Sequence, residues 1–296
     1  ATSDLVFPLI CGCADEVTSR NVVARLAEQD FMTEAGIRVL PYGNPRYDPS
    51  FESGCLGGVW PGVTWWYAMS ASKTDPGLLA ESLRRAYYHY VSDPRTYNTV
   101  PGQFSEWSDG QTLVNRGMRL SPWDSPRFVW SAIEGLAGVT FGINDVALVP
   151  HMPPDWLWLR AQRIPYHGGW LGFFLAKECD GMHVYTANSF ETELTQHHYE
   201  EEISDGLQTI TTGVCAAAFR KDEEVLMCLG NSNEEPTVGP MLAHHALGSR
   251  KEYDVSHINS HQGAWTEIGV MKGQDLMRVA VPVQAHGYAL YRFRER

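Results

Sequence analysis

The hydrophobic periodicity of this chain changes near residue 143, and this change constrains its fold more than any other feature. Before it, apolar residues recur at helical spacing in four segments, 18–32, 59–72, 75–93 and 121–139. After it, apolar and polar residues alternate in short runs that proline and glycine interrupt, a pattern typical of β-strands. The sequence therefore predicts an α+β protein, with a helical part over residues 1–142 and a β-rich part, an antiparallel β-sandwich, over residues 143–296.

The predicted helices are joined by loops longer than most helical connections. The two longest cover residues 33–58 and 101–120. Loops of this length in a compact domain are usually functional or disordered, and the tyrosines and aliphatic residues of the first favour function. The helix starts carry capping signals: Asp75 precedes a proline, and Ser121 and Asp124 stand at the N-cap and N3 positions of an expected capping box.

The charge of the chain excludes one class of partner. Asp and Glu outnumber Lys and Arg by 35 to 23, which gives a net charge of −12. Binding to nucleic acid relies on clustered Lys and Arg, so we expect no nucleic-acid partner. The sequence contains no apolar run of about 18 residues that could cross a membrane, and its first residues carry no basic leader. We expect a soluble protein without a membrane partner, with the cytoplasm favoured.

The cysteines and histidines give no metal pattern along the sequence. The six cysteines are scattered, apart from Cys11 and Cys13, and in a chain of 296 residues we expect buried thiols rather than a disulfide framework. Cys11 and Cys13 lack a second pair at zinc-site spacing. His167 and the pair His197 and His198 also lack metal spacing, and we expect them to lie on the surface or to be packed. The sequence therefore predicts no metal and no cofactor.

Large aromatic residues concentrate around one loop glutamate. Nine of the ten tryptophans fall between Trp60 and Trp170, and Glu106 lies between Phe104 and Trp107. Sugar rings stack their apolar faces on such surfaces, and a carboxylate beside them can act as a general base or as a nucleophile at an anomeric carbon. Further indoles that could line the same cleft are those of Trp65, Trp66 and Trp123.

Each carboxylate of this region also has a purely structural interpretation. Glu106 could be a loop residue that binds backbone amides. Asp109 precedes a glycine, which is typical of a turn, and it lies only three residues from Glu106, whereas the two carboxylates of an inverting glycosidase stand on opposite sides of the scissile bond. Asp124 is expected to cap its helix.

Three stretches resemble the (α/α)₆-barrel carbohydrate enzymes, a clan that includes glucoamylases, debranching enzymes and α-glucosidases. GGVWPGVTWWYAMSA (57–71) is similar to their Gly-Gly-x-Trp-Pro segment in the late helices. FSEWSDGQTLVNRGMRLSPWDSPRFVWSAIEGLAGV (104–139) resembles the region of their catalytic-base glutamate. VALVPHMPPDW (146–156), with IPYHGGWLGFFL (164–175), looks like the segment that follows.

The resemblance implies late helical hairpins of an (α/α)₆ toroid followed by an antiparallel β-sandwich domain. It also implies inverting hydrolysis of a glycosidic bond, with Glu106 as the general base that activates water. The substrate-binding residues that we expect are Trp60, Trp66, Trp107, Trp123 and Asp109. The substrate would be an oligosaccharide, a polysaccharide or a glycoside.

The chain also departs from this family. Such barrels have twelve helices, and their general acid lies on an earlier loop that has no match here. We therefore expect the C-terminal part of a larger enzyme, whose barrel a second polypeptide or a homo-oligomer completes and whose acid comes from elsewhere. Two alternatives stay open: part of an inverting sugar phosphorylase, in which phosphate replaces activated water, and a non-catalytic carbohydrate-binding module.

Overall fold

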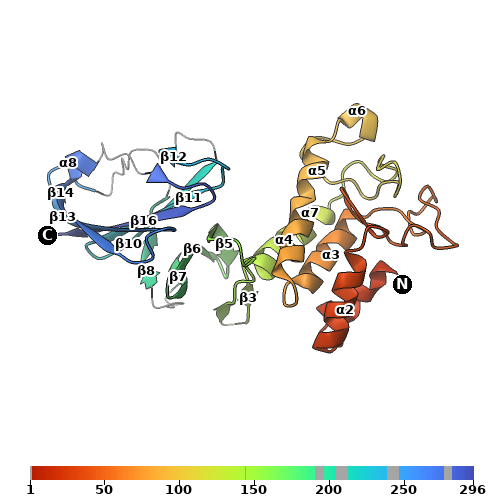
Figure 1. The fold of residues 1–296 in the computed structure, drawn as a ribbon, viewed down its shortest axis with the longest axis horizontal. Helices are drawn as coiled ribbons and strands as arrows, with labels where there is room; N and C mark the ends of the chain where they lie inside the picture. Colours follow the sequence, from red (N-terminus) through yellow and green to blue (C-terminus); the bar gives the residue numbers. More distant parts are fainter. Residues whose placement is uncertain (1, 144, 191–196, 205–212, 239–246, 277–281) are drawn as a thin grey trace. The chain divides into compact units, whose positions relative to one another are not determined.

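The computed structural model describes residues 2–143, 145–190, 197–204, 213–238, 247–276 and 282–296. Its internal contacts divide the chain into two compact units, Ala1–Pro154 and Asp155–Arg296, which we call the helical unit and the β unit (Figure 1). Each unit is described by itself.

Short helices and two small hairpins make up the described part of the helical unit. The helices are η1 (Ser3–Leu5), α1 (Val6–Ile10), α2 (Glu16–Leu26), α3 (Pro61–Ala71), α4 (Pro76–Arg84), α5 (Ala86–Val91), α6 (Pro94–Tyr97), α7 (Asp124–Trp130) and the π-helical turn η2 (Ser131–Leu136). The hairpins are β1 (Met32–Thr33) with β2 (Gly36–Ile37), and β3 (Val139–Phe141) with β4 (Val146–Leu148).

The four segments with helical spacing coincide with α2, α3, α4 with α5, and α7 with η2, so their helical prediction is confirmed, although α2 ends at Leu26 and Met32 already belongs to β1. Asp75 caps α4 as expected, because its side chain accepts a hydrogen bond from the backbone N–H of Leu78 at 2.9 Å. The capping box predicted for Ser121 and Asp124 is wrong. Helix α7 begins at Asp124 itself, after Trp123 at the N-cap, and no side chain caps it. The Asp124 carboxylate lies instead at the start of α3, beside Gly62.

Helix α3 lies at the centre of the helical unit and is apolar around most of its circumference. Its residues Tyr67, Ala68 and Ala71 are fully buried in one core with side chains from α1, α2, α4 and the segment around β1 and β2. The Tyr67 hydroxyl donates to the carbonyl oxygen of Val23 at 3.0 Å, which satisfies its only polar side-chain atom inside this core. A central helix of this kind fixes where its N-terminal residue, Pro61, and the loop before it are placed.

The β unit is built from two main sheets. The four-stranded sheet has the order β5 (Trp158–Tyr166), β6 (Gly169–Glu178), β7 (Gly181–Asn188), β8 (His197–Tyr199). The six-stranded sheet has the order β14 (Thr266–Lys272), β13 (Glu252–Asn259), β16 (Tyr288–Glu295), β11 (Glu224–Asn231), β10 (Val214–Lys221), β9 (Glu201–Glu202). Smaller elements are α8 (Gly273–Leu276) and the pair β12 (Thr237–Val238) and β15 (Pro282–Val283).

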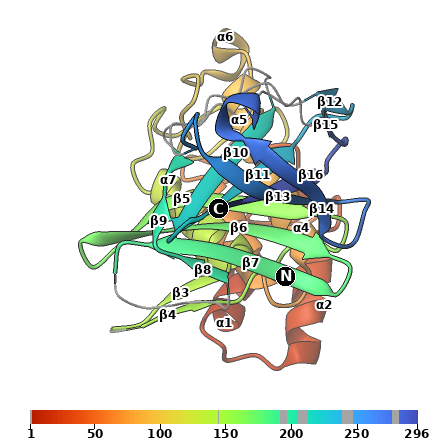
Figure 2. The ribbon, with the colours of Figure 1, turned by 90° about the vertical axis from the view of Figure 1, so that its left-hand side faces the viewer.

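The two sheets of the β unit, whose strands are labelled in Figure 2, share one core of buried side chains. Phe174 and Tyr185 from the four-stranded sheet pack with Phe219, Leu226 and Leu290 from the six-stranded sheet. A second core covers the opposite face of the six-stranded sheet. The expected mixed α+β architecture with antiparallel sheets is thus confirmed, although β8 pairs with β7 in parallel. The described helices do not form a toroid of hairpins.

The cysteines differ from their prediction in burial. All six are free, but only Cys228 is buried, while Cys215 is half-buried and Cys11, Cys13, Cys55 and Cys179 are exposed. The exposed thiols lie in turns and loops or just beyond a strand end, where no sheet or helix covers them. Separately, no helix in the described ranges has the length and apolar character needed to span a membrane.

Replacing Leu226 by alanine tests the shared core of the two sheets. Leu226 is fully buried, and we expect the variant Leu226→Ala to lose about 2–5 kcal/mol of unfolding free energy through lost burial and the cavity left behind. Val270→Ala on β14, where the side chain is 46% exposed, is the control and should change the stability by less than about 0.5 kcal/mol. Urea unfolding followed by circular dichroism measures both. Equal losses would contradict the described packing.

Candidate functional site

Loop segments far apart in sequence are joined by single antiparallel bridges in the helical unit. Val59 pairs with Arg38 on one side and with Ser108 on the other, and Ser108 pairs in turn with Asn115. The pair of Val59 and Ser108 is reciprocal: the N–H of Val59 donates to the Ser108 carbonyl oxygen at 2.8 Å, and the N–H of Ser108 donates back at 2.9 Å. The two long predicted loops are therefore fastened to each other just before α3.

This pairing brings Trp60 and Trp107 together, because each is the chain neighbour of a bridged residue. Both indoles pack against the backbone of Gly54. A methyl group at Gly54 would come within 2.6 Å of the Trp107 ring and 2.8 Å of Trp60 Nε1. Gly54 also has a φ of +66°, a conformation that side chains disfavour. Only glycine therefore fits beneath this pair of indoles, which we call the tryptophan pair.

Glu106 lies beside the tryptophan pair in a fixed orientation. Its N–H donates to the Met118 carbonyl oxygen at 2.8 Å, and its Oε2 accepts from the Met118 N–H at 3.1 Å. A methyl group at Gly117 would approach both the Trp107 ring, at 2.5 Å, and Glu106 Oε2, at 2.8 Å. Glu106 is half-buried, and its Oε1 accepts no hydrogen bond from the described residues. One carboxylate oxygen is held, and the other can accept a proton.

Asp124 is the second carboxylate of this region and is fully buried. It lies at the N-terminus of α3: its Oδ1 would clash with a methyl group at Gly62, and Arg127 Nη1 is 3.6 Å from the same oxygen. Burial raises the pKa of Asp124 to about 6, although the Ser121 hydroxyl, Arg127 and the Gly62 N–H oppose the rise. The charge of Glu106 adds to it.

The contacts that lower the Asp124 pKa are long or bent. Neither oxygen of Asp124 has a hydrogen-bond partner of good geometry among the described residues, and the same holds for the buried Ser121 hydroxyl. The Trp60 indole N–H and the Ser105 hydroxyl are in the same condition. Buried polar atoms are nearly always paired, so their concentration next to Glu106 marks this region as polar and incompletely satisfied.

The other predicted substrate-binding residues lie in different surroundings. Trp66 packs edge-on against Phe7, with ring centroids 4.8 Å apart, and the Arg127 guanidinium stacks over it at 4.3 Å. Trp123 is 39% exposed at the start of α7. Asp109 is buried, and its Oδ1 accepts the N–H groups of Gln111 and Thr112, both at 2.9 Å, as the turn interpretation expects. The structure thus groups Glu106 with Trp60 and Trp107 only.

Sequence reasoning missed two features of this site. It treated Asp124 as the cap of its own helix, while the carboxylate lies at the start of another. It also gave no role to Gly54 and Gly117, whose missing side chains let the indoles and the glutamate approach. Gly54, which precedes CLGG, and Gly117, which precedes Met118, are visible in the sequence. The side chains that pack against these glycines, however, are determined by the bridge between Val59 and Ser108.

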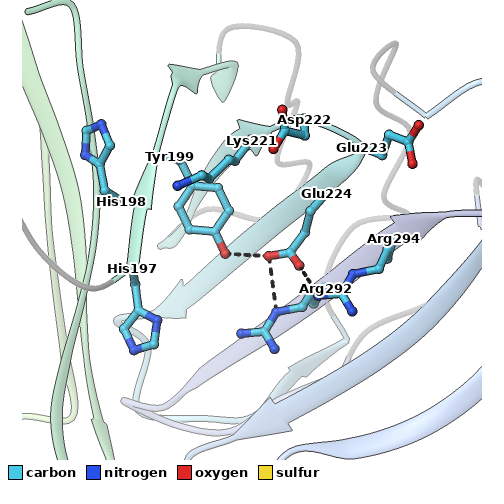
Figure 3. A pocket seen from close by; sticks show the side chains of 9 residues that line it. All are labelled: His197, His198, Tyr199, Lys221, Asp222, Glu223, Glu224, Arg292 and Arg294. Carbon is cyan, nitrogen blue, oxygen red and sulfur yellow. Dashed lines mark hydrogen bonds and ion pairs between the residues drawn. The ribbon is translucent and has the colours of Figure 1, made fainter. Parts of the chain in front are cut away.

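A concave region lies in the β unit (Figure 3). It has a volume of about 790 Å³ and is lined by residues from β8, β10, β11, β16 and the turn between β10 and β11. Glu224 is its best-connected carboxylate: it accepts from the Tyr199 hydroxyl at 2.9 Å and pairs with Arg294 at 2.8 Å and Arg292 at 3.4 Å. Because Glu224 is engaged on both oxygens, it is not a free base.

Comparisons with known proteins give only distant similarities. No protein-family model matches the sequence, and no curated protein matches it. Among solved structures, an uncharacterised conserved protein from Thermus thermophilus aligns with a TM-score of 0.32 and 22% identity over 46% of this chain. This chain spans 29% of the length of that protein.

Two glycoside hydrolase structures are also among the matches. A GH30 endoxylanase from Clostridium papyrosolvens C71 aligns with a TM-score of 0.21 and 15% identity, over 29% of this chain and 21% of its own. The GH family 44 endoglucanase Cel44A from Clostridium thermocellum aligns with a TM-score of 0.19 and 8% identity, over 94% of this chain and 50% of its own. At these scores neither similarity supports an assignment.

The buried carboxylate Asp124 predicts a specific pH dependence of stability. Because its pKa is raised in the folded protein, the folded state binds more protons than the unfolded state between about pH 4 and pH 6. The free energy of unfolding should therefore fall as the pH rises through this window, relative to the variant Asp124→Asn, and the difference should be constant above about pH 7. Urea unfolding of both proteins from pH 4.5 to 7.5 measures it. A pH-independent difference would contradict the raised pKa.

Proposed function

We propose that this chain is the C-terminal portion of an inverting glycoside hydrolase, with Glu106 as its general base. One observation carries the proposal: the half-buried Glu106 carboxylate stands beside the tryptophan pair, with Oε2 held by the Met118 N–H and Oε1 without a partner among the described residues. The resemblance of residues 57–71 and 104–139 to (α/α)₆-barrel enzymes supports the same assignment.

The geometry indicates what each residue would do. The half-buried Trp60 indole would offer flat apolar surface to the C–H face of a sugar ring, whereas the Trp107 indole is only 5% exposed and would shape the site by packing. The Met118 N–H and the close packing at Gly117 limit the rotation of the Glu106 carboxylate. Oε1 would then take a proton from water as the water oxygen attacks the anomeric carbon, while the leaving-group oxygen receives a proton from a separate acid on the opposite face.

The general acid of this proposal would come from another segment or chain. Asp124 is fully buried, so it is not placed to protonate a leaving group, and Asp109 is engaged in its turn. An incomplete helical unit should also expose apolar surface. Tyr87 and Tyr90 on α5 are 68% and 67% exposed, and they line a shallow hollow of about 320 Å³ with Phe104. Such a patch favours a further polypeptide or a second copy over this face.

One observation favours the binding-module alternative. The hydrogen bond from Met118 to Glu106 Oε2 is also what a purely structural loop glutamate would make, and the tryptophan pair could bind glycan without turnover. A phosphorylase part differs in a simple way, because its turnover would require inorganic phosphate.

The variant Glu106→Gln tests the proposed base. We expect it to lower kcat/KM for the cleaved glycoside by about 10²- to 10⁴-fold, because glutamine cannot take a proton from water. The protein is purified with any chain that accompanies it and is assayed against a panel of α- and β-linked oligosaccharides, with proton NMR to follow the anomer first released. Glu52→Gln, an exposed glutamate of the 33–58 loop, is the matched control and should retain full activity.

Each alternative predicts a different result in the same assay. Glycan binding without turnover, unchanged in Glu106→Gln, would reject the hydrolase and indicate a binding module. Turnover that requires phosphate would indicate a phosphorylase. An intact-mass measurement of the native protein shows whether a second polypeptide is present. Full activity of a lone 33.2 kDa chain would contradict the proposed incompleteness.

A further inference from the structure

Three potential metal ligands meet at one end of the four-stranded sheet. Glu178 ends β6, Asp180 lies in the turn, and His183 follows in β7. One carboxylate oxygen from each acid and one ring nitrogen of His183 all lie within 4.8 Å of one another. This cluster belongs entirely to the β unit and is separate from the Glu106 site, so it does not depend on the proposed function.

Two further residues hold the cluster in place. The Tyr185 hydroxyl donates to Glu178 Oε1 at 2.5 Å, which fixes one oxygen of this carboxylate. His197 lies on β8, directly opposite Tyr185 in the parallel pairing of β7 and β8, and its ring stacks on the Tyr185 ring at 4.9 Å. Supporting contacts of this kind are what orient the ligands of metal sites.

His183 uses both of its ring nitrogens. Nε2 lies 2.8 Å from Asp180 Oδ1, and Nδ1 lies 3.1 Å from His197 Nε2. In one tautomer His183 donates Nε2–H to Asp180 and accepts from His197, which satisfies both contacts without an ion. In the other, His183 donates Nδ1–H to His197, and its bare Nε2 and the Asp180 carboxylate can both bind a cation. The same tautomer is the one that metal-bound histidines adopt, since they donate their other N–H to a neighbour.

We propose that Glu178, Asp180 and His183 bind a divalent transition-metal ion, with Zn²⁺ as the best-suited species. One imidazole and two carboxylates form a mixed ligand set that zinc accepts, whereas Ca²⁺ and Mg²⁺ prefer oxygen ligands alone. Ligand atoms around tetrahedral zinc lie about 3.4 Å apart, whereas His183 Nε2 and Asp180 Oδ1 lie 2.8 Å apart and all three ligand atoms lie within 4.8 Å, so a rotation of the exposed Asp180 side chain would adjust the spacing. Three protein ligands leave a fourth position for water or a ligand group.

The neighbouring His197 connects the cluster to the concave region of the β unit, since its Nε2 lies 3.1 Å from His183 Nδ1. His197 also lines the concave region of Figure 3, so an ion at this cluster would be one residue away from that surface.

Isothermal titration of the full chain with ZnCl₂ at pH 7.5 tests the proposal. The exposed thiols could bind zinc by themselves, so the protein used carries serine at Cys11, Cys13, Cys55 and Cys179. We expect one equivalent of zinc to bind, and we expect Asp180→Asn and His183→Ala each to weaken the affinity at least about tenfold. His261→Ala, an exposed histidine outside the cluster, should leave the affinity unchanged.

The results with the variants show whether zinc binds at Glu178, Asp180 and His183. Asp180 is exposed, so Asp180→Asn should keep the fold, as circular dichroism checks, even if His183→Ala does not. Absence of zinc binding, or the same affinity in Asp180→Asn as in its parent, would overturn the proposal. Tighter binding of Ca²⁺ than of Zn²⁺ would also overturn it, because that preference excludes an imidazole ligand.

Discussion

The candidate site of the helical unit depends on two hydrogen bonds between Val59 and Ser108. This short link determines which side chains meet, because Trp60 follows one bonded residue and Trp107 precedes the other. Gly54 then lies beneath both indoles, and the close packing at Gly117 holds Glu106 next to one of them. Without this bridge the long loops would have no common register, and an aromatic-rich composition alone would not create a binding surface.

The start of α3 has a second role, since it receives a carboxylate from a different helix. The N-terminus of a helix carries unpaired N–H groups and a partial positive charge, which favour an anion. Asp124 occupies this place, near Gly62 and Arg127, but burial outweighs these contributions and raises its pKa. The negative charge of Glu106 adds to this rise, so the buried carboxylate at the start of α3 and the glutamate of the neighbouring loop interact electrostatically.

The helices and strands of this protein could be predicted from the sequence more fully than the tertiary contacts between them. Helical spacing located α3 and the pair α4 and α5, and alternation located the strands, because each pattern reflects local burial. It could not show that Asp124 serves another helix, since that contact joins segments that periodicity treats separately. It grouped Trp66 with Trp60 and Trp107, although Trp66 packs against Phe7 and Arg127. Composition identifies a surplus of indoles, and only the tertiary contacts decide which residues each of them packs against.

The same distinction applies to His197, the residue that supports the proposed metal ligand His183. Motif spacing detects ligands that one helix or one loop presents, and His183 and His197 are fourteen positions apart on different strands. Their rings meet because β7 and β8 pair in parallel, with Tyr185 opposite His197. Two parallel strands need a connection that leaves the sheet and returns. The register between them therefore cannot be predicted from the local alternation of apolar and polar residues. The three proposed ligands lie within one hairpin, but the contact between His183 and His197 is made across this parallel pair, so it becomes recognisable only through distances between side-chain atoms.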